Sequence, residues 1–486
     1  MQTISQTSFS PISMMDDFGR VFFQDGKIYR AIRTDRNDYC LNLLSSDLYQ
    51  ELLEHGYLPK TTVSDLRIEN YGIVLEHEKL LSTYQHEWTF SMLKDAASLI
   101  FNINKICGKY GYELKDAHLF NVLFRGVQPV WVDIGSISPV KPASKQWRAY
   151  GEYLNAIVIP LSFLSCGKPF IGRKLLESIY YGLNTLPNQN ALDSGLLSLL
   201  QLQKPVEYFI LNFRRKKILK TKKKWFILSF LSKFAEKFSI LFFKRPDSFF
   251  YYYKPHRQVR NITELFPSDE IEQYLRSLPR PALSSLWQGY HRNYSDEKGE
   301  LQYSDRFKRI LEIIQSKSDI ETVIDLAGNE GLFSEFLYDN VLGLDRIITT
   351  DYDENAIDYA YNKFKAIQTN KLHALLLNFM YTPDMEGTQK RLKSDLALAL
   401  AVSHHLILTA NYSLGAIFEK IRSYSNRYVM IEFMPLGLWS SKSEKESIVP
   451  DWYSVEWFRA EFQSYFTILL EEKIEKNRIL FFGSIN

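Results

Sequence analysis

Short hydrophobic runs alternate with stretches of helical periodicity throughout the C-terminal half of the chain. This alternation is typical of βαβ units and of a parallel sheet. Five runs fit parallel strands, and the last two fit an antiparallel hairpin, because the few polar residues between them are too short for a crossover. The runs are residues 322–326, 346–351, 373–377, 395–401, 428–433, 466–473 and 478–485. The pattern therefore predicts an α/β, Rossmann-like domain with seven strands.

A turn of small residues follows the first of these runs. It reads Asp325-Leu-Ala-Gly-Asn-Glu-Gly331 and leads into a helix that should begin near Leu332. Small residues let the backbone approach a ligand, and a helix N-terminus offers free N–H groups. The second run ends at Asp351, where an acidic side chain can accept hydrogen bonds from both hydroxyls of a ribose. This spacing favours a nucleoside ligand, and the alternative is that Asp351 only caps the next helix.

Polar residues also follow the later runs. Asn378 comes after the third run, His404 and His405 come after the fourth, and Glu432 lies in the fifth. The carboxyl ends of parallel strands border the crevice in which open α/β sheets bind ligands. An imidazole there can act as a general base at neutral pH, or the two histidines can support the loop through hydrogen bonds. Glu432 is a second candidate, for orienting an acceptor.

Together these residues resemble a known family. The turn is similar to the D/E-x-G-x-G-x-G cofactor loop of class I S-adenosylmethionine-dependent methyltransferases, with Ala327 and Asn329 in place of two glycines. The D-L-A-G-N and H-H-L segments resemble, more narrowly, bacterial methyltransferases of the nodulation host-specificity type. The resemblance implies S-adenosylmethionine as the cofactor, with His404, His405 and Glu432 as candidates for catalysis. The cofactor contacts that it implies are Asp325, Ala327, Gly328, Asn329, Gly331, Asp351, Tyr352, Asn378, Phe379 and Ala401.

The N-terminal half carries a second group of polar residues. Asp116 and Asn121 are followed, after a predicted hairpin, by Asp133-Ile-Gly135. This segment resembles the D-x-x-x-x-N and D-F-G elements of the protein-kinase-like superfamily, and His118 brings it nearest to the aminoglycoside phosphotransferases. The resemblance implies an α+β kinase-like fold that binds ATP. Asp116 would accept the proton of the acceptor, and Asn121 and Asp133 would hold Mg²⁺.

Other parts of this half match the kinase-like pattern less closely. Helices are expected over residues 88–110 and 146–165, but neither a glycine-rich loop nor a V-A-I-K motif is present. Arg33 or Lys27 is the candidate for the missing lysine, with Glu51 or Glu54 as its partner, and Leu114 stands where active members often carry histidine. An active phosphotransferase and a pseudokinase that binds a nucleotide or a partner both remain open.

A basic segment separates the two halves. Eight Lys and Arg residues between 214 and 224 precede an apolar helical stripe at residues 225–243. Such a segment is typical of a helix on an anionic membrane surface, and the alternative is a solvated charge run before a helix packed between domains. The expected organisation is a kinase-like domain at 1–210, a basic amphipathic connector at 211–265 and a methyltransferase domain at 266–486.

Composition limits the remaining possibilities. A net charge of +3 with 45% hydrophobic residues fits a globular protein and argues against nucleic acid as the partner. Cys40, Cys107 and Cys166 are far apart and odd in number, so the spacing of a zinc site is absent, and a disulfide framework is not expected in a chain of this size. The N-terminus lacks the pattern of a secretory signal, and charges interrupt residues 225–243, so a bilayer span is not expected. We expect a cytoplasmic protein, held at the inner face of the membrane if residues 214–243 bind lipid.

The order of the domains leads to two hypotheses of function. In domain content, though in reversed order, the chain resembles bifunctional kinase–methyltransferases that cap surface polysaccharides. The leading hypothesis is a methyltransferase acting on a saccharide or glycolipid hydroxyl or phosphate, with a kinase-like domain that phosphorylates or presents the acceptor. The alternative is a small-molecule tailoring methyltransferase with an inactive pseudokinase scaffold that binds a partner.

Overall fold

A computed structural model describes most of both halves of the chain. The described residues are 16–141, 147–178, 270–282, 304–382, 387–438 and 449–485, together with 3–4, 8–10, 13 and 285. The chain divides into two units, one formed by residues 1–177 and 275–486 and the other by residues 178–274. The predicted connector at 211–265, its lipid-binding stretch at 214–243 and the domain boundaries expected at 210 and 266 lie outside the described residues.

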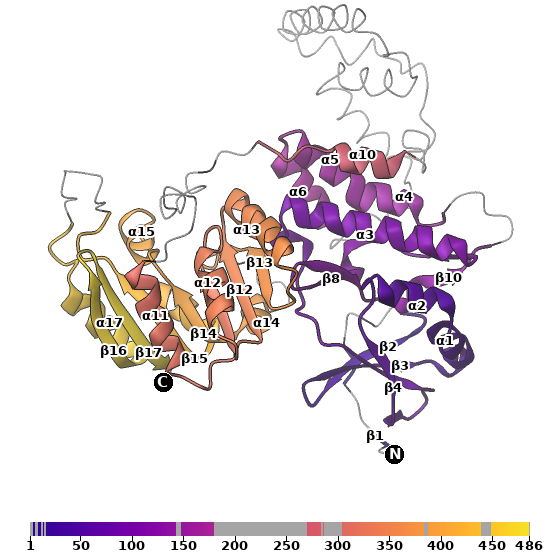
Figure 1. Ribbon diagram of the computed structural model, residues 1–486, viewed down its shortest axis with the longest axis horizontal. Helices are drawn as coiled ribbons and strands as arrows, with labels where there is room; N and C mark the ends of the chain where they lie inside the picture. Colours follow the sequence, from indigo (N-terminus) through magenta and orange to yellow (C-terminus); the bar gives the residue numbers. More distant parts are fainter. Residues whose placement is uncertain are drawn as a thin grey trace, which may run out of the picture. The chain divides into compact units, whose positions relative to one another are not determined.

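The C-terminal half contains the predicted seven-stranded sheet (Figure 1). Its strands are β11 (Thr322–Leu326), β12 (Arg346–Asp351), β13 (Leu372–Leu376), β14 (Ser394–Ala399), β15 (Ser425–Phe433), β16 (Phe466–Glu475) and β17 (Arg478–Ile485). Their order in the sheet is β13-β12-β11-β14-β15-β17-β16, and β17 is antiparallel to both of its neighbours. The order reverses between β11 and β14, so the crevice for a ligand lies at the carboxyl ends of these strands.

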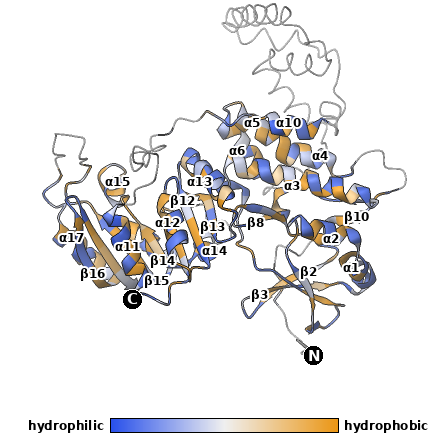
Figure 2. Ribbon diagram, viewed as in Figure 1, coloured by the Kyte–Doolittle hydropathy of each residue, from blue (hydrophilic) through white to orange (hydrophobic). Residues whose placement is uncertain are grey.

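Helices cover both faces of this sheet, because right-handed crossovers in the two directions from β11 place their helices on opposite sides. The helices are α11 (Asp305–Gln315), α12 (Leu332–Asn340), α13 (Glu354–Ile367), α14 (Thr388–Leu392), α15 (Ser403–Leu408), α16 (Leu414–Ser423) and α17 (Val455–Tyr465). Phe307 of α11 packs on Phe333 of α12, and Phe418 of α16 packs on Phe462 of α17. The central strands carry hydrophobic stretches, whereas the helices show hydrophobic and hydrophilic faces (Figure 2).

The N-terminal half is α+β. A four-stranded antiparallel sheet has the order β2-β3-β6-β4 and is followed by a helical part. The sheet consists of β2 (Gly19–Gln24), β3 (Lys27–Ile32), β4 (Thr61–Ser64) and β6 (Val74–His77), with α1 (Asn37–Leu44) and α2 (Asp47–Glu54) inserted after β3. The helical part contains α3 (Phe90–Lys109), α4 (Tyr150–Tyr153), α5 (Ile159–Ser165), α6 (Pro169–Ser178) and α10 (Ile271–Ser277). Short strands complete it: β1 (Thr3–Ile4), β5 (Arg67–Ile68), β7 (Tyr112–Leu114), the hairpin β8 (Val122–Arg125) and β9 (Gln128–Trp131), and β10 (Ile137–Pro139).

Both helices expected in this half are present. The helix expected over 88–110 is confirmed as α3. The helix expected over 146–165 runs from Tyr150 to Ser165, and a π-helical turn at Leu154–Val158 lies between α4 and α5. Pro160 lacks the N–H group that a continuous helix would need, which explains the change in hydrogen bonding just before it. In the described ranges, no helix combines the length and hydrophobicity of a membrane span.

Candidate cofactor site

The turn after β11 keeps a glycine-like backbone although two glycines of the motif are replaced. Ala327, Asn329 and Gly331 have φ angles of 65°, 51° and 71°, in the left-handed region. Asparagine adopts this conformation more readily than most residues, whereas for alanine it costs about 1 kcal/mol. Gly328 has no room for a side chain, because a Cβ atom there would lie 2.7 Å from Asp325 Oδ2. The two replacements therefore still allow a tight turn.

Asp351 closes this turn from the neighbouring strand β12. Its Oδ2 accepts a hydrogen bond from the Asn329 N–H at 3.1 Å, and its Oδ1 accepts one from the Asp353 N–H at 2.9 Å. The side chain that caps α13 is that of Asp353, which accepts from the N–H groups of Asn355 and Ala356, so the capping role considered for Asp351 belongs to Asp353. Both oxygens of Asp351 have a further lone pair, with which they can accept ribose hydroxyls.

Two buried carboxyls lie together under the turn. Asp325 and Asp351 are only 3% and 6% exposed. Burial raises the pKa of Asp351 to about 6, although backbone N–H donors oppose the rise. Burial, and then the charge of Asp351, raise the pKa of Asp325 to about 7. A cationic ligand in contact with this pair would favour the ionised form of both groups.

Three of the expected cofactor contacts differ in accessibility. Tyr352, directly after Asp351, is 60% exposed and can lie against a planar base. Asn378 is exposed, and its Oδ1 accepts hydrogen bonds from the N–H groups of Met380 and Tyr381 at 3.1 and 3.3 Å. Its amide nitrogen is thus the part that can face a ligand. Phe379 is 5% exposed, so it belongs mainly to the core.

Glu432 is fully buried on β15 and holds the turn after β14. Its Oε1 accepts from Arg306 Nε at 2.5 Å, and its Oε2 accepts from Arg306 Nη2 at 2.7 Å, Arg478 Nη1 at 2.9 Å and the Ala401 N–H at 2.8 Å. Ala401 has a left-handed φ of 53°. Burial alone would raise the pKa of Glu432, but the two arginines lower it below its usual value. This geometry favours a role in positioning the turn over direct contact with an acceptor.

Arg306 and Arg478 were missed by the sequence analysis. They are 6% and 9% exposed, and both contact Glu432. One signal was available for Arg306, which lies beside Phe307 and within one turn of Ile310 on an amphipathic helix. A charged residue on the buried face of a helix requires a buried partner.

His404 and His405 lie in the first turn of α15 and not at the end of a strand, because β14 ends at Ala399. Their ring centroids are 4.1 Å apart. His404 is 6% exposed, its Nδ1 has no hydrogen-bond partner among the described residues, and burial lowers its pKa to about 3. His405 is half-buried, and burial lowers its pKa as well. His404 is therefore neutral at physiological pH, and its Nδ1 is a buried polar atom without a partner among the described residues.

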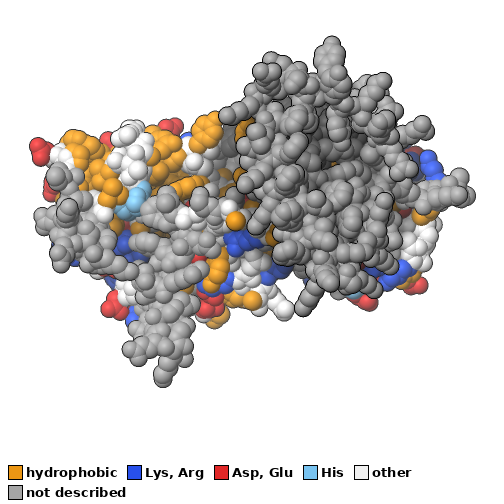
Figure 3. All heavy atoms as spheres, turned by 90° about the horizontal axis from the view of Figure 1, so that it is seen from above, with side chains coloured by type: hydrophobic (Ala, Val, Ile, Leu, Met, Phe, Trp, Pro, Cys, Tyr) orange, Lys and Arg blue, Asp and Glu red, His pale blue; other side chains and the backbone are white. Residues whose placement is uncertain are grey.

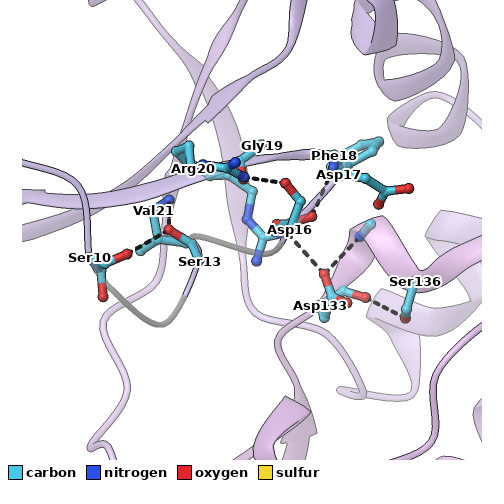
Figure 4. A network of polar contacts seen from close by, with 12 residues as sticks. Ser10, Ser13, Asp16, Asp17, Phe18, Gly19, Arg20, Val21, Asp133 and Ser136 are labelled. Carbon is cyan, nitrogen blue, oxygen red and sulfur yellow. Dashed lines mark hydrogen bonds and ion pairs between the residues drawn. The ribbon is translucent and has the colours of Figure 1, made fainter. Parts of the chain in front are cut away.

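In the N-terminal half, Asp133 is paired with a protein cation. Asp133 Oδ1 accepts from Arg30 Nη1 at 3.0 Å and from the Gly135 N–H at 3.1 Å. Asp16 reaches the same guanidinium at 3.3 Å, and the two aspartates lie close together (Figure 4). Asn121 is nearby, since its carbonyl accepts the Val132 N–H at 2.9 Å. Asp116 follows β7, and burial raises its pKa.

The cation at this site differs from the expected ones. Lys27 pairs with Glu76 at 2.8 Å, and Arg33 pairs with Asp35 at 2.9 Å. Glu51 is bound by Lys109 and Tyr110, and Glu54 is exposed. Arg30, which is 7% exposed, takes the place proposed for Lys27 or Arg33. Among the described residues, no three His, Cys, Asp or Glu side chains are grouped to hold a metal ion.

The chain is similar to a known protein over most of its length. No family model matches the chain. Over 460 residues it is 24% identical to nodulation protein NoeA of Rhizobium meliloti (strain 1021), covering 87% of this chain and 84% of that protein. The strand order and the antiparallel β17 are those expected of the class I family. The C-terminal half has the S-adenosylmethionine-dependent methyltransferase fold.

Solved structures similar to this chain match it in part. The PH0226 protein of Pyrococcus horikoshii OT3 is 18% identical, with 41% of this chain and 99% of that chain covered and a TM-score of 0.31. The N-methyltransferase NodS of Bradyrhizobium japonicum WM9 is 11% identical, with 37% and 94% covered and a TM-score of 0.28. An S-adenosylmethionine-dependent methyltransferase of Clostridium acetobutylicum ATCC 824 is 14% identical, with 39% and 94% covered and a TM-score of 0.31.

Proposed function

We propose that this chain is an S-adenosylmethionine-dependent methyltransferase. The observation that supports this most strongly is the contact of Asp351 with the left-handed turn after β11, at the point where the strand order reverses. A carboxylate at the end of β12 can bind a ribose, and the tight turn lets the backbone come close to the same ligand. Exposed Tyr352 is available for the adenine.

The charges around the crevice suit a cationic cofactor. Asp325, Asp351 and Glu432 supply three carboxyls, against which Arg306 and Arg478 supply two positive charges. When bound, S-adenosylmethionine supplies an activated methyl group on a positively charged sulfur. The residues of the chain then have to orient the acceptor and exclude water.

His404 is the residue that we assign to proton removal from a hydroxyl acceptor. Its imidazole is neutral, and its Nδ1 has no partner among the described residues. A base with a low pKa is a weak acceptor of protons in the ground state, so His404 would act by hydrogen bonding to the hydroxyl and taking the proton as the methyl group is transferred. His405, beside it, would support the loop.

For the acceptor we propose a saccharide or glycolipid hydroxyl or phosphate. Aromatic side chains are exposed in segments that leave the carboxyl ends of β13, β14 and β15: Tyr381 is 77%, Tyr412 is 36% and Trp452 is 52% exposed. Flat aromatic faces of this kind can pack against sugar rings. Figure 3 shows hydrophobic side chains gathered at the left of the view, on the side of the C-terminal half.

A second candidate concerns the N-terminal half, as an inactive kinase-like scaffold that binds a partner. The observation that favours it is the contact of Arg30 with both Asp133 and Asp16, because the guanidinium neutralises a carboxylate that a divalent cation would need. If the N-terminal half is instead an active phosphotransferase, it should bind ATP in a Mg²⁺-dependent manner, and Asp133→Ala should abolish that binding. Absence of ATP binding by the folded wild-type protein would leave the scaffold as the better account.

The proposed activity is tested by turnover. Purified protein is incubated with isotope-labelled S-adenosylmethionine and a panel of oligosaccharides, glycolipids and small aromatic alcohols, and labelled products are identified by mass spectrometry. We expect transfer to a saccharide that is lost in His404→Ala and retained in His405→Ala. Transfer only to small aromatic alcohols would support the tailoring enzyme, and no transfer to any acceptor class would count against the proposal.

A further inference from the structure

Helix α13 begins immediately after the proposed ribose-binding residue. The Asp353 N–H donates to Asp351, and Asp353 Oδ1 accepts from the N–H groups of Asn355 and Ala356 in the first turn of the helix, at 2.9 and 3.3 Å. The carboxylate of Asp351 and the start of α13 thus form one hydrogen-bonded unit. A shift or rotation of α13 would move a donor that holds Asp351.

Two acidic residues of α13 are covered by the N-terminal half. In an isolated methyltransferase domain they would lie on the exposed side of the helix. Asp358, 1% exposed, accepts from the Ser91 N–H and the Ser91 hydroxyl, each at 2.9 Å. Glu354 accepts from the Phe90 N–H at 3.0 Å. Phe90 and Ser91 are the first residues of α3, so the two carboxylates bind free N–H groups where the helix dipole favours negative charge.

Arg173 of α6 completes this arrangement. Its Nη2 donates to Glu354 at 2.6 Å, and its Nη1 donates to the carbonyls of Trp88 and Gln85 at 2.7 and 3.3 Å. The guanidinium therefore ties α13 to the segment that leads into α3. The side chain of Arg173 is only 18% exposed, so solvent screens its interaction with the Glu354 carboxylate only weakly.

Further along α13, a second group of contacts joins the same two parts. The Tyr361 hydroxyl lies 2.7 Å from Asp95 and 3.0 Å from the carbonyl of Val127. Lys365 donates to Asp95 at 2.6 Å. A Cβ atom on Gly126, in the β8–β9 turn, would lie 2.5 Å from the carbonyl oxygen of Thr369, so the two backbones are in close contact. Contacts along the whole length of α13 leave it little freedom to move.

We infer that the N-terminal half positions the cofactor site of the methyltransferase half, with Arg173 and the start of α3 fixing α13 and thereby Asp351. This inference rests on the proposed function of Asp351 as the ribose-binding residue. It assigns the N-terminal half a role in the methyltransferase that does not depend on ATP. Arg173, Phe90 and Ser91 are positioning residues, since they act on the site through Glu354 and Asp358.

A matched pair of arginines tests this inference in the full-length chain. Arg125 makes the same kind of contacts as Arg173, to the carboxylate of Glu78 at 2.6 Å and to the carbonyls of Gly56 and Leu58, and both arginines are 18% exposed. Among the described residues, the hydrogen-bond partners of the Arg125 side chain lie within the N-terminal half. Arg125→Ala is therefore the control for a general loss of stability.

The measurements are the melting temperature and the affinity for S-adenosylhomocysteine, determined by calorimetric titration. We expect both variants to melt earlier than wild type, and only Arg173→Ala to bind S-adenosylhomocysteine about fivefold to tenfold more weakly. Equal affinity of the two variants would overturn the inference and leave the proposed function intact. No binding by folded wild-type protein would instead contradict the proposed function. If Arg173→Ala does not fold, Glu354→Gln takes its place, because glutamine keeps the shape of the side chain. Its melting temperature and affinity are then compared with those of Arg125→Ala.

Discussion

The carboxyl group of Asp351 must be ionised to accept hydrogen bonds from two ribose hydroxyls. Its pKa of about 6 and that of Asp325, about 7, both lie above the ordinary value of 3.8. A group with a raised pKa holds its proton more tightly in the folded state, so its stabilising contribution is complete below pH of about 4 and is lost as the pH rises through 6 to 7. The contribution of these two carboxyls to stability and the affinity for the cofactor therefore depend on pH in opposite directions.

We expect the affinity for S-adenosylhomocysteine to be constant above pH of about 7 and to fall as the pH decreases through 6. The melting temperature of the ligand-free wild type, taken relative to that of Asp351→Asn at each pH, should change in the opposite sense over the same range. Titration calorimetry and thermal melts from pH 5 to 8 measure both quantities. In Asp351→Asn, which binds more weakly, the remaining dependence of affinity on pH should be much reduced. An affinity that rises on acidification would contradict this account.

Two arginines one turn apart on α11 distinguish buried from exposed charge. Arg306 is 6% exposed and binds Glu432, whereas Arg309 pairs with Glu472 at the surface. Removal of Arg306 leaves Glu432 buried with one partner fewer, so we expect Arg306→Ala to lower the free energy of unfolding by about 3 kcal/mol. Arg309→Ala should change it little. Urea denaturation measures both, and a similar loss in the two variants would show that the buried pair has no special role.

Some of these site residues could be identified from the sequence and others could not, for a physical reason. Asp325, Gly328 and Asp351 could be found because each stands at a fixed distance from a strand that periodicity reveals. Arg306 and Arg478 could not be assigned, since the partner they share, Glu432, is far away in the chain and no local pattern links them. Arg30 is a similar case, because its partner Asp133 lies 103 residues further along the chain.

At the scale of elements, the turn after β11 depends on backbone conformation more than on side-chain chemistry. Gly331 has a φ of 71°, and a Cβ atom there would lie 2.6 Å from Phe364 Cζ on α13. We expect Gly331→Ala to destabilise the protein by about 2 kcal/mol and to weaken cofactor binding.

Ala327→Gly should instead stabilise the protein by up to about 1 kcal/mol, because glycine adopts the left-handed conformation without strain.

Chemical denaturation and titration with S-adenosylhomocysteine test both variants. Loss of binding in Ala327→Gly would mean that the methyl group of Ala327 contacts the ligand and that its effect is not only conformational. Unchanged stability in Gly331→Ala would show that the turn can relax away from Phe364, and the positive φ would then not be required.

Elements were easier to predict than their ends. The seven strands follow from runs of apolar residues of the length of a strand, and α3 follows from its helical period. The end of β14 was predicted too far along the chain. The apolar run continues to residue 402, whereas the strand ends at Ala399 and the backbone turns at Ala401. The hydrogen bond from Ala401 to Glu432 sets that end, and it depends on a residue of the next strand.

At the scale of the whole molecule, α13 and α3 should respond together to the cofactor. Ligand binding at Asp351 stabilises the start of α13, and the contacts of Glu354 and Asp358 transmit this to Phe90 and Ser91. We expect S-adenosylhomocysteine to slow hydrogen exchange in both helices and to leave the β2–β3 hairpin unchanged. Mass spectrometry of peptides from each segment measures this, and protection confined to residues 325–356 would contradict the coupling.

The contacts between the two halves could not be predicted from the sequence. Acidic residues of α13 such as Glu354 and Asp358 are indistinguishable, in one sequence, from the solvated face of an ordinary amphipathic helix. Their burial results from α3 and Arg173, which belong to a part of the chain more than a hundred residues away. The sequence therefore indicated two halves with separate sites, while the structure adds the contacts through which one half holds the other.

The most direct test of the central claim is a calorimetric titration of the full-length protein with S-adenosylhomocysteine, alongside Asp351→Ala. The account predicts one site per chain with micromolar affinity in the wild type, and no measurable binding in the folded variant. Equal binding by the two proteins would place the ligand elsewhere. No binding by folded wild-type protein would mean that the turn with Ala327 and Asn329 does not accept the cofactor, and it would contradict the proposed methyltransferase activity.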